Sequence, residues 1–232
     1  MSEKERGFLG QIRGSLISPR GAFESVDGKD LWKGAVLIII LTAVSAWAGY
    51  TYASKLPVSI SEGFGSLGRA SPFGRAGSPM QFTDPEVFRR NTMTLYALRD
   101  GLEVFTGWLI TAVLLHLFAS LMAGRGSLKR TLALTGFASI PLLFQQFLRL
   151  IDAYTISGDA FLGIMGNRIL GKTLTLRLMS EALNAFTVFG LWTLALNIVA
   201  VSINYTASTK KAAAAVISSY VLLIILRLFL PI

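Results

Sequence analysis

Two glycine-rich stretches have the spacing of nucleotide-binding loops. Residues 166–173 read GNRILGKT and match the phosphate-loop pattern of GxxxxGK followed by Ser or Thr. Gly63, Gly65 and Gly68 match the dinucleotide pattern GxGxxG. Such loops hold phosphate only where a strand leads into them and a helix follows. No strand pattern precedes residues 63–68, and apolar runs flank residues 166–173, where a short interfacial helix is the better interpretation. We therefore expect no nucleotide to bind at either stretch.

Residues suited to catalysis are scarce in this chain. It has one histidine, His116, no cysteine, and carboxylates scattered along its length. Enzymatic chemistry needs a nucleophile beside a base, two acids at one depth, or a cluster of metal ligands. None of these can be assembled from the sequence, so we expect a protein that is not an enzyme and holds neither a metal nor a cofactor.

Polar side chains inside apolar runs are the remaining candidates, because burying them in a membrane is costly and often serves a function. They are His116, Asn197, Gln145, Gln146, Arg149 and Asp152. They either line a polar path or form hydrogen bonds between helices, and the second use is the more common one. Arg149 and Asp152, three residues apart, are placed to pair on one helix face.

The composition predicts the elements that position these side chains. Of the 232 residues, 53% are hydrophobic and 15% charged, and the mean hydropathy is +0.58. Five apolar runs are long enough to cross a bilayer as helices. They cover residues 34–52, 103–123, 132–151, 182–203 and 212–230. The expected fold is an all-α polytopic membrane protein, with residues 1–33 before the membrane domain 34–232 and a long external loop over 53–102.

A parallel internal repeat is a further expectation. Shifting residues 103–149 by 81 positions lays them over residues 184–230 without a gap. His116 then falls on Asn197, and the pair Lys129–Arg130 falls on Lys210–Lys211. The polar coincidences predict two related helix hairpins, although apolar sequences also match one another by chance.

The basic residues indicate lipid headgroups as partners. The formal net charge is +9, and the Lys and Arg residues cluster beside apolar runs, without the aromatic interleaving typical of nucleic-acid binding. In residues 1–33, arginines recur every seven positions, and Leu9, Ile12 and Leu16 follow helical spacing. This segment is either an amphipathic helix on an anionic leaflet or a solvated cytosolic helix. The candidate headgroup ligands are Arg6, Arg13, Arg20, Lys129, Arg130, Lys210 and Lys211.

The distribution of basic residues also predicts orientation. Short basic connections favour the cytoplasm, which places the N-terminus inside and the C-terminus outside the cell membrane. Residues 34–52 are expected to stay as the first membrane helix, because the 33 residues before them are too long for the start of a signal peptide.

Several short motifs resemble the YIP-domain family of Ypt/Rab-interacting membrane proteins. Residues 18–23 read SPRGAF and are similar to the family's SPxxAF opening. Residues 124–130, 136–141 and 204–212 resemble its basic loop, its proline-containing third helix and its small-residue turn. The resemblance implies five membrane helices, a cytoplasmic N-terminus and no catalytic residues. Eukaryotic relatives bind Rab-type GTPases through a long N-terminal region, whereas this chain has only about thirty residues there, which suggests a prokaryotic member.

Two functions follow from these observations. The first is a non-enzymatic membrane protein that binds lipids, a protein partner or a second copy of itself. The alternative is a small permease or lipid mover with a polar path between the two hairpins. A water-filled cavity reaching His116 and Asn197 would favour the alternative, and a dry packed interface would favour the first.

The phosphate-loop match yields a direct prediction. Substituting Lys172→Ala should leave the affinity for ATP and GTP unchanged, because the sequence supplies neither the preceding strand nor a metal-binding Asp. Equilibrium binding of labelled nucleotide to both proteins measures this. Saturable binding to the parent chain that disappears in the variant would contradict it.

Overall fold

In the computed structural model the described residues are 7–55, 85–158 and 187–229, and every regular element within these ranges is a helix. In chain order they are α1 (Phe8–Ile17), α2 (Pro19–Glu24), the 3-10 helix η1 (Gly28–Asp30), α3 (Leu31–Ala53), α5 (Pro85–Ala123), α6 (Leu128–Ala138), α7 (Ile140–Thr155), α10 (Val188–Asn204) and α11 (Thr209–Phe229). The predicted all-α fold is confirmed.

Membrane-length helices account for most of the described chain. Gly28–Ala53, Arg89–Met122 and Thr209–Arg227 are each long and apolar enough to cross a membrane. The pair formed by α6 and α7 makes a fourth span if it is counted as one bent helix. Helix α10 is apolar but has only 17 residues, and the predicted start of its span at residue 182 lies outside the described residues. The helical membrane class is confirmed, and the count of five spans stays a prediction.

The third predicted span, residues 132–151, is wrong as a single straight helix. It begins earlier, at Leu128, where the side chain of Ser127 accepts a hydrogen bond from the amide of Arg130. It then breaks at Ser139 and bends by 41° before continuing to Thr155. The cause is Pro141, which has no amide hydrogen and cannot bond to the carbonyl one turn back.

Helix α5 is longer than the sequence pattern predicts. It begins at Pro85, well before the predicted span 103–123, and continues without a break to Ala123. Gly101 does not interrupt the helix. A Cβ atom at this position would lie 3.4 Å from side-chain atoms of Thr42 and Ala46, so α3 packs closely against α5 there. The 39 residues of α5 span roughly 58 Å, about twice the hydrocarbon thickness of a bilayer.

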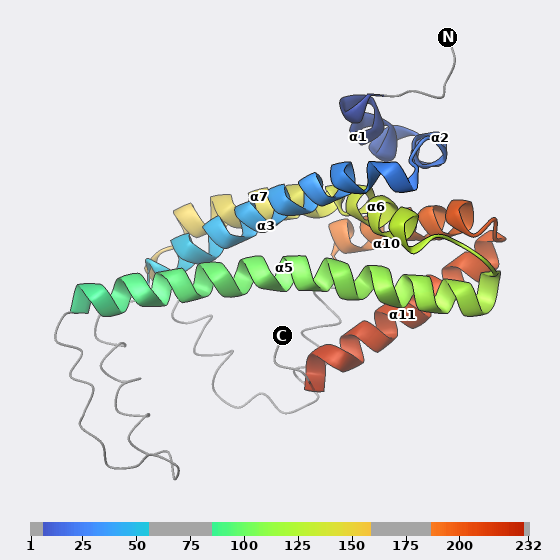
Figure 1. Cartoon of the computed structure of the whole chain (residues 1–232). Helices are drawn as coiled ribbons and strands as arrows, with labels where there is room; N and C mark the ends of the chain where they lie inside the picture. The colour runs from blue at the N-terminus through green and yellow to red at the C-terminus, as the bar shows by residue number, and fades with distance from the viewer. Residues whose placement is uncertain (1–6, 56–84, 159–186, 230–232) are drawn as a thin grey trace.

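Five helical segments form a ring. α3 contacts α5, α5 contacts α11, α11 contacts α10, α10 contacts α7, and α7 returns to α3 (Figure 1). The two hairpin tips, residues 124–127 and 205–208, meet at one end, where the side chain of Asn204 bonds to Ser127. We call this the basic end, defined by Arg125, Lys129, Arg130, Lys210 and Lys211. The opposite end, defined by Tyr52, Asp100 and Arg149, is the far end.

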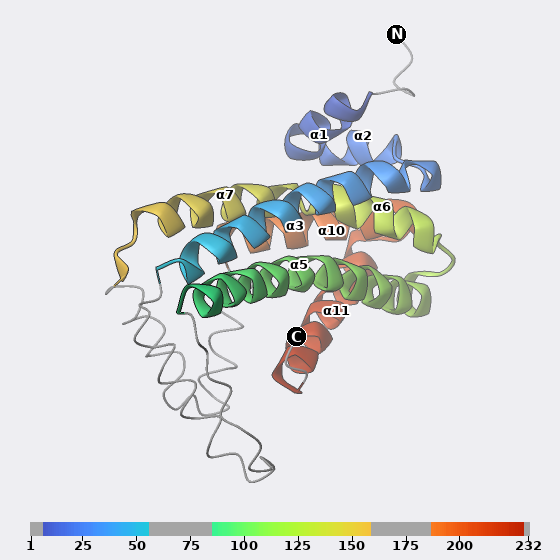
Figure 2. The ribbon, with the colours of Figure 1, turned by 60° about the vertical axis from the view of Figure 1, so that its left-hand side comes forward.

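The short helices α1 and α2 lie on one side of the bundle near the start of α3 (Figure 2), where α2 contacts α10 and α1 contacts α6 and α7. Pro19 occupies the first turn of α2, and Ala22 and Phe23 of the same SPRGAF segment are fully buried. They join a core cluster with Phe137 of α6 and Leu196 of α10. The N-terminal helices are therefore part of the folded bundle.

Two glycines allow α3 and α6 to touch through their backbones. A methyl group on Gly136 would lie 2.6 Å from the Cα of Gly34, and one on Gly34 would lie 2.7 Å from the carbonyl oxygen of Ala133. Contacts between small residues are a major source of helix association in membranes, where no hydrophobic force draws helices together. A second small-residue face, Ser45 and Gly49, packs against Asp100 of α5.

The glycine contact can be tested by adding one carbon atom. Gly136→Ala should lower the free energy of unfolding by about 1–3 kcal/mol, because backbone atoms of α3 must move to admit the methyl group. Thermal unfolding of the purified chain in detergent measures the change.

Gly107→Ala is the matched control for this substitution. Its methyl group would meet only the end of the flexible Arg227 side chain, at 3.4 Å. This variant should be neutral or up to about 1 kcal/mol more stable, since Ala favours helix over Gly. Equal stability of Gly136→Ala and the parent would show that α3 and α6 are not in close backbone contact.

Candidate functional site

The N-terminal helix α1 has one face on the bundle and one face turned outward. Phe8, Ile12 and Leu16 pack against the core cluster, and Gln11 and Ser15 between them are buried. The predicted apolar face of Leu9, Ile12 and Leu16 is divided, because Ile12 and Leu16 pack on the core of the bundle whereas Leu9 is exposed on the outer face. The side chains of Arg13 and Arg20 are exposed, and Arg6 lies outside the described residues.

The other predicted headgroup ligands divide into two groups. The exposed ones at the basic end are Lys129, Lys210 and Lys211. Arg130 is half-buried and donates to the carbonyl oxygens of Val26, at 2.9 Å, and Phe23, at 3.4 Å. It thereby ties the tip of the first hairpin to the segment after α2. This internal contact explains a basic residue at that position without a lipid.

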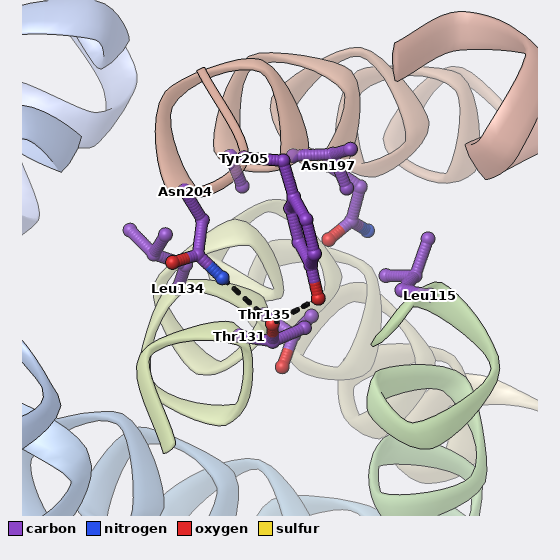
Figure 3. A pocket seen from close by; sticks show the side chains of 9 residues that line it. Leu115, Thr131, Leu134, Thr135, Asn197, Asn204 and Tyr205 are labelled. Carbon is purple, nitrogen blue, oxygen red and sulfur yellow. Dashed lines mark hydrogen bonds between the residues drawn. The ribbon is translucent and has the colours of Figure 1, made fainter. Parts of the chain in front are cut away.

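His116 belongs to a polar layer near the basic end. Its Nδ1 lies 2.5 Å from the hydroxyl of Tyr205, which follows α10. That hydroxyl also contacts Thr131 of α6 at 3.3 Å, and the amide of Asn204 donates to Thr131 (Figure 3). The same amide donates to the carbonyl of Ser127. Three helices from two hairpins are joined by this layer.

The space beside this layer is dry. Leu115, Leu134, Asn197 and Tyr205 surround a gap that has no volume for a water molecule (Figure 3). Packed side chains therefore fill this part of the bundle.

A cavity of about 640 Å³ occupies the opposite half of the ring. Its walls come from α3, α5, α6, α7, α10 and α11. The lining includes the predicted polar residues Asn197, Gln145, Gln146 and Arg149, but not His116. The predicted residues His116 and Asn197 are not direct partners. Asn197 lines both the cavity and the dry gap and bonds to Tyr220, whereas His116 lines neither and bonds to Tyr205. A cavity of this size falls in the range of small-molecule sites.

The mouth of the cavity, at the far end, carries charges. Arg149 pairs with Asp100 of α5, with 2.6 Å between the guanidinium nitrogen and the carboxylate oxygen. The expected pairing of Arg149 with Asp152 is wrong, because Asp152 accepts from the hydroxyl of Tyr52 instead, at 2.5 Å. The other charged residues of the lining are Arg99, Glu103 and Arg227.

Uncharged polar residues also belong to the lining of the cavity, among them Gln146, Thr193 and Asn197. The amide of Asn197 donates to the hydroxyl of Tyr220 at 3.0 Å, which leaves its Oδ1 without a hydrogen-bond partner among the described residues. Thr193 Oγ1 and Gln146 Oε1 are likewise buried and unpartnered within that part of the chain. Buried polar groups without partners are uncommon, and each calls for an explanation.

Sequence reasoning missed several residues of these two sites. Tyr205 and Tyr220 are the partners of His116 and Asn197, and Asp100 is the partner of Arg149. A carboxylate just before an apolar run and tyrosines near the ends of such runs were the available signals. Both nucleotide-loop matches, residues 63–68 and 166–173, lie outside the described residues.

Comparison with known proteins gives one match. The family model described as the Yip1 domain matches residues 13–230, which is nearly the whole chain. No curated protein and no solved structure matches the chain.

The polar layer yields a double-mutant test. Tyr205→Phe and His116→Leu each remove one partner of the same hydrogen bond, so their effects on the free energy of unfolding should not add. We expect a coupling of about 0.6–1.7 kcal/mol, the range of polar contacts between membrane helices. Thermal unfolding in detergent of both single variants and the double variant measures it.

The control pair combines His116→Leu with Tyr154→Phe. Tyr154 lies at the far end, bonded to Trp47. Those two changes should add within about 0.5 kcal/mol, because the sites share no partner. Strict additivity of the first pair would mean that the Tyr205 hydroxyl does not bond to His116.

Proposed function

The chain belongs to the Yip1 domain family, and on this premise we propose that it is a non-enzymatic membrane protein that binds anionic lipid headgroups through its N-terminal segment. The observation that carries the proposal is the outer face of α1. Leu9 and Ile17 are 78% and 71% exposed there, with Arg13 between them at helical spacing. Apolar side chains mixed with arginine on one helix face are typical of helices that lie in a membrane interface.

The surroundings of α1 support an interfacial position. Trp32, in the first turn of α3, is 58% exposed and lies beside Phe8 of α1, with 6.1 Å between ring centroids. Tyr50, also exposed, lies 18 residues further along α3, roughly 27 Å at 1.5 Å per residue. Aromatic residues favour the two interfaces of a bilayer, and this separation is close to its hydrocarbon thickness of about 30 Å. Trp32 and α1 would then share the headgroup level at the basic end.

Electrostatics gives the expected strength of binding to an anionic membrane surface. Each basic residue near an anionic surface contributes about 1 kcal/mol, so Arg13 and Arg20 together contribute roughly 2 kcal/mol. This corresponds to a change of about thirtyfold in occupancy of the surface. The exposed lysines of the basic end would add to the same attraction. We place this end, and the N-terminus with it, in the cytoplasm, where anionic lipids are concentrated.

The cavity favours a second candidate, a small permease or lipid mover. Asn197 and several charged groups line the cavity, as a polar path would require. The dry layer at Tyr205 supports binding rather than open passage, because movement across the bundle would require that layer to open. Partner proteins and self-association remain part of the first proposal, through the same outward face.

A single-cysteine label tests the proposal on the full chain. The sequence has no cysteine, so Leu9→Cys can carry one environment-sensitive fluorophore. In nanodiscs containing anionic lipid its emission should shift to the blue relative to neutral nanodiscs, and salt at about 1 M should reduce the shift by screening. Adding Arg13→Glu and Arg20→Glu should abolish it.

The same label at Arg125→Cys is the control. This residue is exposed in the loop at the tip of the first hairpin, and its emission should not depend on lipid charge. An equal shift of the Leu9 label in neutral and anionic nanodiscs would refute the electrostatic part. No shift in either would identify the outer face of α1 as a surface for a protein partner.

A further inference from the structure

Helix α7 has apolar side chains on its exposed side and polar residues on the side that lines the cavity. Phe144, Phe147 and Leu148 are exposed, whereas Gln145 and Arg149 lie on another side of the helix and belong to the lining. A helix of a water-soluble protein shows the reverse pattern, because its apolar face is the buried one. The inverted pattern is typical of a membrane helix with lipid on one side and water on the other.

Helix α5 shows the same inversion. Arg99, Glu103 and Thr111 line the cavity, and their spacing of four and eight residues places them along one stripe of the helix. Leu109 and Val113, on another side of α5, are exposed. Two separate helices therefore contribute polar residues to one cavity and apolar residues to the outside of the bundle.

The charged residues of the lining require water. Arg149 and Asp100 form a 2.6 Å ion pair whose side chains are 39% and 13% exposed, and Glu103 is half-buried. Removing water from an ionised group inside a membrane is costly even when the group is paired. The cavity of about 640 Å³ is large enough to hold that water, since one molecule takes about 30 Å³ in the liquid.

The lining also extends far along the membrane-length helices. On α3 it runs from Tyr52 to Ile38, which is roughly 21 Å at 1.5 Å per residue, and on α5 from Arg99 to Thr111, roughly 18 Å. The hydrocarbon core of a bilayer is about 30 Å thick. Water that fills the cavity from the far end would therefore reach about the middle of the membrane.

The cavity adjoins the dry gap beside Tyr205. Thr135 and Asn197 line both spaces, and the gap has no volume for a water molecule. Water in the cavity is therefore expected to stop at the gap.

We propose that the cavity is a water-filled vestibule that opens at the far end, admits small polar solutes to about the middle of the membrane, and stops at the dry gap beside Tyr205. The inference deepens the second candidate function, a small permease, by assigning its path to water-soluble solutes instead of lipid chains. It does not depend on the outer face of α1. Access of a solute is measured without transport, so a vestibule in a chain that moves no solute can be recognised.

Thiol modification measures this access, because the chain has no cysteine of its own. Single-cysteine variants of the full chain in nanodiscs are treated with 2-(trimethylammonium)ethyl methanethiosulfonate, a charged reagent that stays in water and reacts with the thiolate. Thr111→Cys should be modified at least about tenfold faster than Val113→Cys, because thiolate and reagent meet only in water. Val113, two residues further along α5 and 52% exposed on the outside, is the matched control at nearly the same depth. Mass spectrometry of the intact protein follows the reaction.

The dry gap has a probe of its own. Val201 of α10 lines the gap and is 2% exposed, so Val201→Cys should react as slowly as Val113→Cys. Modification of Val201→Cys at the rate of Thr111→Cys would show that water continues past the gap. Equal rates for Thr111→Cys and Val113→Cys would show that the cavity is not a separate aqueous space. Either result overturns the proposal.

Narrowing the vestibule tests where it opens. Glu103 lies eight residues before Thr111 in the same stripe, roughly 12 Å nearer the far end. Adding Glu103→Trp should slow the modification of Thr111→Cys about fivefold or more, because a large ring then fills the route. Adding Leu102→Trp, one residue earlier and exposed on the outside of α5, is the matched control and should leave the rate unchanged.

Thermal unfolding shows whether both tryptophan variants are folded. If Glu103→Trp is not, Glu103→Cys supplies the second readout, since a cysteine nearer the opening should react at least as fast as Thr111→Cys. An unchanged rate with folded Glu103→Trp, or slower modification of Glu103→Cys than of Thr111→Cys, would place the opening elsewhere and contradict the proposal.

Discussion

The close approach of α3 and α6 at Gly34 and Gly136 is the contact on which the rest of the bundle depends. Without Cβ atoms at these positions the two backbones meet, and this brings the N-terminal helices onto the core through Phe23. It also places Arg130 within reach of two carbonyl groups after α2. The gap beside Tyr205 toward the basic end admits no water, whereas a cavity of about 640 Å³ lies toward the far end.

The polar groups follow this gradient of packing. At the tight end, His116, Tyr205 and Thr131 satisfy one another and no water fits beside them. At the open end, Asn197 Oδ1 and Thr193 Oγ1 have no hydrogen-bond partner among the described residues, and charged side chains line the cavity. In a membrane a polar group needs a partner within the protein or within a water-filled space. The polar layer at the basic end uses the first of these solutions.

Sequence periodicity and length predicted the helices because a bilayer forces each span to satisfy its own backbone. They did not predict how far α5 extends, because its first turns are amphipathic and resemble a surface helix. The bend at Ser139 was foreseeable from Pro141, although its size depends on packing. The polar residues were recognisable individually from their cost in lipid. Their partners were not, since Asp100 and Tyr205 are brought to Arg149 and His116 only by tertiary contacts.

The uninterrupted length of α5 has a mechanical consequence. One continuous rod of 39 residues carries Asp100 at the mouth of the cavity, His116 in the dry layer and the start of the basic loop. Gly101 within this helix packs against Thr42 and Ala46 of α3, which supports the helix near the cavity. Any force that tilts α5 at the mouth must displace its other end as well. Helix α5 therefore couples a movement at one end of the bundle to a movement at the other end.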